Sequence, residues 1–113
     1  MNRRDFLASA SATTVLPLTA LAGQAPLRLR AEAVTQQILP DGDGATAMLG
    51  FNGSMPGPEL RIRRGKRVVI DVENGLEEGT AVHWHGVRLE NQMDGVPTLT
   101  QEIINPGEIH TYS

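Results

Sequence analysis

Two histidines separated by one residue are the side chains best suited to chemistry, in the segment His83-Trp84-His85-Gly86. In an extended strand, residues i and i+2 project from the same face, about 6.5–7 Å apart. Two imidazoles at that spacing cannot easily coordinate the same ion. Each can instead bind one of two neighbouring metals, or complete a site whose other ligands come from elsewhere. Imidazole suits copper, zinc, iron and nickel. The alternative is an ordinary pair of surface histidines.

The composition excludes several other classes of function. A length of 113 residues allows one domain. The net charge of −3 argues against a nucleic-acid partner. Because the chain has no cysteine, disulfides, thiolate metal sites and cysteine nucleophiles are excluded within it.

Alternation of apolar and polar residues predicts short strands separated by Gly- and Pro-rich turns. The expected strands are residues 27–33, 45–51, 60–64, 68–72 and 80–89, and a last strand that begins near residue 108. No window longer than about ten residues keeps a helical period. We therefore predict an all-β domain, built as an antiparallel sandwich. The last strand is still running at Ser113, so we expect a fragment whose sandwich is incomplete at its C-terminus.

The first 22 residues predict an export signal. Arg3 and Arg4 precede a mildly apolar stretch, and the sequence up to Ala22 fits a cleavage site. One alternative, a short helix of the domain, would be broken by Pro17. The other, a membrane anchor, needs ~20 strongly apolar residues. We predict a signal peptide over residues 1–22, a domain over residues 23–113 and no stable membrane anchor.

The segment Arg3-Arg4-Asp5-Phe6-Leu7 resembles the bacterial twin-arginine signal. The resemblance implies the twin-arginine translocase as a partner during export, and a periplasmic destination.

Five motifs occur in a fixed order along the rest of the chain. They are Gly53-Ser54-Met55-Pro56-Gly57-Pro58, His83-Trp84-His85-Gly86, Met93-Asp94-Gly95-Val96-Pro97, Thr100-Gln101 and Pro106-Gly107-Glu108. Together they resemble the first cupredoxin domain of the multicopper oxidases, a family that includes laccases and bacterial copper-resistance oxidases. The resemblance extends from about Leu27 to Ser113. It implies a cupredoxin-like Greek-key β-sandwich and copper as the cofactor.

The resemblance also implies roles for three residues. His83 would bind the type 2 copper and His85 one of the type 3 pair. Asp94 would hydrogen-bond copper-bound water and help to deliver protons, which suits a carboxylate beside a metal-bound water. Without the resemblance, Asp94 is better interpreted as a turn residue, because Asp-Gly is a common turn dipeptide.

The family's oxidases need four His-x-His pairs and a His-Cys-His segment, whereas this chain has one pair and no cysteine. It should not reduce O2 alone. Our leading hypothesis is the exported N-terminal domain of an oxidase that reduces O2 to water and oxidises a phenol, an amine or a metal ion. The remaining cupredoxin domains of that oxidase would be its partners. One alternative is a stand-alone periplasmic copper-binding module. Another is a scaffold that lost its metal, against which His83 and His85 argue.

Two features depart from the family pattern. The family often has an acidic residue where Lys66 stands, within a basic cluster around Gly65 that we interpret as a solvated strand face. His110 stands where the family usually has an apolar or aromatic residue, and we expect it to be exposed or partly packed.

Overall fold

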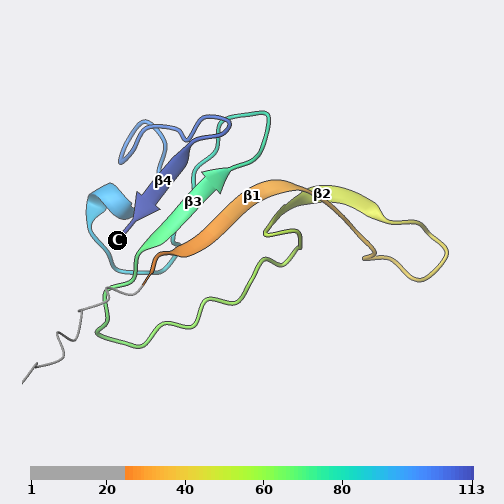
Figure 1. The fold of residues 1–113 in the computed structure, drawn as a ribbon, viewed down its shortest axis with the longest axis horizontal. Helices are drawn as coiled ribbons and strands as arrows, with labels where there is room; N and C mark the ends of the chain where they lie inside the picture. The colour runs from red at the N-terminus through yellow and green to blue at the C-terminus, as the bar shows by residue number, and fades with distance from the viewer. Residues whose placement is uncertain (1–24) are drawn as a thin grey trace, which may run out of the picture.

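A computed structural model describes residues 25–113, which form one four-stranded sheet (Figure 1). The strands are β1 (Leu27–Gln36), β2 (Thr46–Phe51), β3 (Ile70–Asn74) and β4 (Ile109–Tyr112), in the order β2-β1-β3-β4. In this part of the chain the only helical element is the short 3-10 helix η1 (Asn91–Met93). The all-β prediction is therefore confirmed.

The predicted signal peptide, residues 1–22, lies outside the described residues. Among residues 25–113, no helix has the length and apolar character needed to cross a bilayer.

Strand β1 pairs with two different strands along its length. Its first half, from Leu27 to Ala31, runs parallel to β3, and its second half, from Ala31 to Gln36, runs antiparallel to β2. Strand β4 completes the sheet antiparallel to β3. In Figure 1 the hairpin of β1 and β2 extends away from β3 and β4. The expectation of a purely antiparallel sheet was therefore wrong at the β1–β3 pair, because alternation shows which face is buried but not which strand is the partner.

Two segments with an alternating pattern are not strands. Residues 60–63 have no ladder pairing and lead into a turn at Arg64 and Gly65, and Val68 and Val69 are likewise unpaired in any ladder before β3 begins. In the predicted strand 80–89, Thr80 forms an isolated bridge with Ile104, and the chain then turns at His85 and Gly86. A strand needs a neighbour that accepts its backbone hydrogen bonds, and no described strand lies beside residues 81–89.

The core lies on one face of the sheet. Leu29, Ile70, Val72 and Tyr112 from three strands form a buried cluster with Ile104. The segment 75–108 covers this cluster and packs Val82, Trp84 and Met93 against it. The second layer is thus mostly irregular chain among the described residues.

Asn74 fixes this covering segment to the end of β3. Its side chain is fully buried, and its Nδ2 donates to the carbonyl oxygens of Glu78 and Ile104, both at 2.8 Å. Its Oδ1 accepts a hydrogen bond from the backbone N–H of Leu76 at 2.9 Å. A buried amide that satisfies three backbone groups holds the chain in one path, because each group would cost free energy if left unpaired.

Candidate metal centre

The two predicted ligands lie on the irregular segment that covers the sheet. The side chains of His83 and His85 are both exposed, with ring centroids 5.5 Å apart and ring planes at 72°. Trp84, between them, packs against the core instead. The His-Trp-His sequence therefore places two imidazoles toward solvent and uses the indole as the anchor.

The ring of His83 is held by the turn that contains Asp94. Its Nδ1 lies 2.6 Å from the backbone carbonyl oxygen of Asp94 and 3.6 Å from the carboxylate Oδ1. Because a carbonyl oxygen only accepts hydrogen bonds, Nδ1 is the nitrogen that donates, and in the neutral imidazole the lone pair then lies on Nε2. Histidines that bind metals usually donate their other ring N–H in this way. The structure thus brings together His83 and Asp94, which are eleven positions apart in the sequence.

Gly95 allows the Asp94 turn to approach the histidine segment. Its φ is +77°, a region that side chains disfavour. A Cβ at Gly95 would overlap the carbonyl oxygen of Val82 and would lie 2.9 Å from the Cα of His83. Only glycine lets these two backbones lie in direct contact, so Gly95 is a structural requirement for the contact between Asp94 and His83.

Tyr112, on β4, supports the other side of the histidine segment. The backbone N–H of Val82 donates to the phenolic oxygen of Tyr112 at 3.2 Å. The rings of Trp84 and Tyr112 meet edge to face, with centroids 5.3 Å apart and planes at 80°. The contact of Tyr112 with the candidate metal centre depends on a loop path that residue patterns do not encode, so the sequence alone did not point to it.

His110 does not join the candidate metal centre. It is partly buried on β4, with its ring centroid 4.6 Å from that of Tyr112. Its Nε2 is buried and has no hydrogen-bond partner among the described residues. Of the two expectations for His110, partial packing is the one observed.

The available side chains make an incomplete metal site. Among residues 25–113, no three side chains of His, Cys, Asp or Glu are grouped so that they could hold one ion. Two exposed imidazoles with a separation of 5.5 Å between their centroids fit a role as partial ligands. They would have to be completed by groups from outside the described part of the chain.

Comparison with known proteins decides the family. The sequence profile of the family described as multicopper oxidase matches residues 32–113. The chain belongs to the multicopper oxidase family. A copper resistance protein A homolog from Pseudomonas syringae pv. tomato is 45% identical over 76 residues, and the match covers 67% of this chain and 13% of the relative. Laccase-2 of Botryotinia fuckeliana is 45% identical over 78 residues, or 66% of this chain and 13% of that protein. The chain thus spans only a small part of these multicopper oxidase relatives.

Solved structures of multicopper oxidases confirm the cupredoxin-like fold. Lac15, from a marine microbial metagenome, superposes with a TM-score of 0.75 at 52% identity, over 78% of this chain and 24% of that one. A multi-copper oxidase from Pseudomonas thermotolerans gives a TM-score of 0.72 at 39% identity, over 77% of this chain and 21% of that one. Membership of this family implies copper as the cofactor.

Proposed function

We propose that this chain is the N-terminal cupredoxin domain of an exported multicopper oxidase and supplies His83 and His85 to its trinuclear copper centre. In this proposal His83 binds the type 2 copper and His85 one of the type 3 pair. The whole enzyme would take electrons from a phenol, an amine or a metal ion. It would use four electrons and four protons to reduce O2 to two molecules of water.

The observation that carries the proposal is the state of the His83 ring. Its Nδ1–H is committed to the carbonyl oxygen of Asp94 at 2.6 Å, so its Nε2 is oriented and available as a ligand. Both rings are exposed, which suits ligands that a neighbouring domain must complete.

The family membership supports the choice of copper over the other metals that imidazole can bind. When bound, copper supplies the electron transfer to O2. The residues of this chain orient ligands and handle protons. Asp94 has its carboxylate 3.6 Å from Nδ1 of His83, a position from which it can hold a proton beside the centre.

The test replaces His83 and His85 singly by alanine in the full-length gene product, with His110→Gln as a matched histidine control. The substitutions at the exposed His83 and His85 should each leave the fold intact, lower the copper content per chain and abolish O2 consumption. The control His110→Gln should retain both the copper content and the O2 consumption of wild type. Full copper content and full oxidase activity in His85→Ala would overturn the ligand assignment. Copper loss in a product that shows no O2 consumption even as wild type would instead favour the copper-binding module.

Export is the second part of the proposal. Residues 1–22 would form a twin-arginine signal peptide that directs the folded protein to the periplasm. Substitution of both Arg3 and Arg4 by lysine keeps the charge but removes the arginine pair, so it should leave the precursor in the cytoplasm. The single change Arg28→Lys is the matched control. Normal periplasmic accumulation of the double variant would contradict this route.

A further inference from the structure

A second feature, separate from the histidines, is a concentration of positive charge at one exposed turn. Five of the seven residues from 61 to 67 are basic, although the chain as a whole has a net charge of −3. A hydrogen bond of 3.1 Å from the N–H of Lys66 to the carbonyl of Arg63 closes the turn, and Gly65 has a φ of +78°. These side chains are all exposed. The local charge is therefore opposite in sign to that of the chain.

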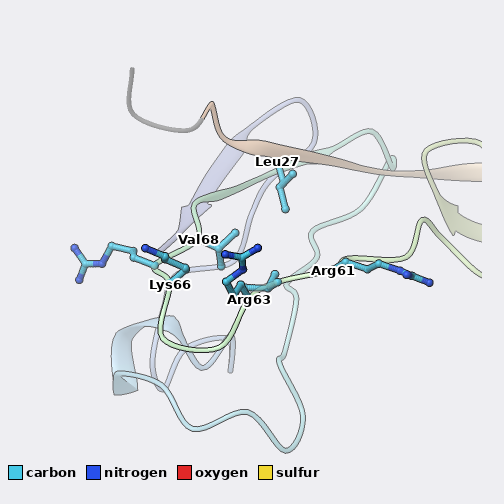
Figure 2. A pocket seen from close by; sticks show the side chains of 7 residues that line it. Leu27, Arg61, Arg63, Lys66 and Val68 are labelled. Atoms are coloured by element: carbon cyan, nitrogen blue, oxygen red, sulfur yellow. The ribbon is translucent and has the colours of Figure 1, made fainter. Parts of the chain in front are cut away.

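The turn borders a hollow of about 450 Å³ (Figure 2). The hollow is lined by four basic side chains and three aliphatic ones, namely Arg61, Arg63, Lys66, Arg67, Leu27, Ile62 and Val68. No carboxylate is among them. In Figure 2, Leu27 points from the start of β1 toward Val68 and Arg63, whereas Arg61 points away.

Few of these cations have an acidic partner. Arg61 pairs with Glu59 at 2.9 Å. The ion pairs found within residues 25–113 include none to Arg63, Lys66 or Arg67. By contrast, Arg30 on β1 pairs with both Glu32 and Glu73. A hollow lined by charges of one sign concentrates counter-ions, so this one attracts anions.

We propose that this hollow binds a ligand that carries phosphate groups. The planar guanidinium of arginine matches two phosphate oxygens at once, and the lysine ammonium adds a compact charge. The aliphatic side chains of Leu27, Ile62 and Val68 offer a wall for the carbon part of such a ligand. A hollow of this volume can enclose a small molecule or a lipid headgroup, whereas the flat surface of a protein partner would not fill it. Phosphate is the chemistry that both sources share.

The experiment uses the full-length gene product and the triple variant Arg63→Gln/Lys66→Gln/Arg67→Gln. A control variant, Arg28→Gln, removes an exposed positive charge whose side chain does not line the hollow. One arm titrates pyrophosphate by calorimetry at low ionic strength. The other arm sediments vesicles of phosphatidylglycerol, with phosphatidylcholine vesicles as the neutral reference. Copper content and thermal midpoint should be unchanged in both variants.

We expect the triple variant to bind at least about tenfold more weakly, because charge-assisted hydrogen bonds are lost, while the control binds as wild type. A loss seen with pyrophosphate supports a soluble ligand, and a loss seen only with phosphatidylglycerol supports a lipid headgroup. Absence of binding in both arms, or equal binding by wild type and triple variant, would overturn the proposal. None of these readouts depends on the oxidase activity, so the two proposals fail separately.

Discussion

The backbone N–H of Val82 donates a hydrogen bond to the phenolic oxygen of Tyr112, 3.2 Å away, and so ties the residue before His83 to strand β4. Tyr112 is only 3% exposed and also packs edge-on against Trp84. The histidine segment has no strand ladder of its own. Its position therefore depends on this side chain, on Asp94 and on the contact at Gly95.

The change Tyr112→Phe tests this support. The ring contact with Trp84 should survive, but the N–H of Val82 loses its partner, at a cost of about 1–3 kcal/mol in the free energy of unfolding. We expect a lower copper content as well, because the histidine segment can shift. Urea unfolding and metal analysis of the full-length product measure both effects. Thr111→Val is the matched control, since it removes a neighbouring hydroxyl that donates to Asp71 at 2.7 Å. Equal copper loss in the two variants would argue against a positioning role for Tyr112.

The change Gly95→Ala should be more damaging than the same change at Gly107. Both glycines have positive φ, +77° and +80°, so both variants incur the left-handed penalty of about 1–2 kcal/mol. Only at Gly95 does the new Cβ also meet the backbone of Val82 and His83, whereas Gly107 has open space. Soluble yield and thermal midpoint report the difference. Similar midpoints for the two variants would show that the Asp94 turn can move away without cost.

The change Asp94→Asn separates the role of the backbone carbonyl of this residue from that of its carboxylate. The backbone carbonyl that holds His83 remains, so copper content should stay close to that of wild type. The carboxylate is lost, and O2 consumption should fall at least about tenfold if it relays protons. Asp43→Asn, in an exposed turn, controls for the loss of charge. A large loss of copper with the asparagine variant would mean that the carboxylate holds the site together.

The change His110→Phe should stabilise the protein or leave it unaffected. The phenyl ring keeps the contact with Tyr112 and removes a buried Nε2 that has no hydrogen-bond partner in residues 25–113. An unpaired buried polar group costs about 1–3 kcal/mol, so part of that free energy should be regained. Thermal unfolding measures the change. A clear drop in the midpoint would reveal a partner for Nε2 elsewhere in the full-length protein.

The sequence predicted β1 and β3, in which buried apolar residues alternate with more exposed ones. Leu29 and Ala31 in β1 and Val72 in β3 are buried at alternate positions, so their pattern was decisive. Val82 and Trp84 in the predicted strand 80–89 also alternate with polar residues, but they pack in a covering loop that pairs with no described strand. Alternation reports burial on one side, and strand pairing needs a partner as well. Periodicity therefore overestimated the extent of the sheet.

The candidate site was only partly predictable. The His83–His85 pair can be identified in the sequence because two histidines separated by one residue are a recognisable pattern of candidate metal ligands. The resemblance implied a place for Asp94 near the copper centre, but the contact of its backbone carbonyl with His83 was not predicted, since these residues are eleven positions apart and meet through a turn that depends on one glycine. The support from Tyr112 crosses 30 positions and links a backbone N–H to a side chain. No pattern of residue types records such a contact.

Because β1 pairs with β3 in its first half and with β2 in its second half, the backbone amides of the two parts of the sheet should differ in their protection from exchange with solvent. Only Ala31 pairs on both sides, and beyond it the β1–β2 hairpin is fastened to the sheet through β1 alone. A two-stranded ribbon with exposed Leu49 is marginal in water, so its amides should exchange with solvent through local fraying. The amides of β3, buried between β1 and β4, should exchange only when the whole domain unfolds. Hydrogen exchange should therefore be slow in the first half of β1, which pairs with β3, and fast in its second half beyond Ala31, which pairs only with β2.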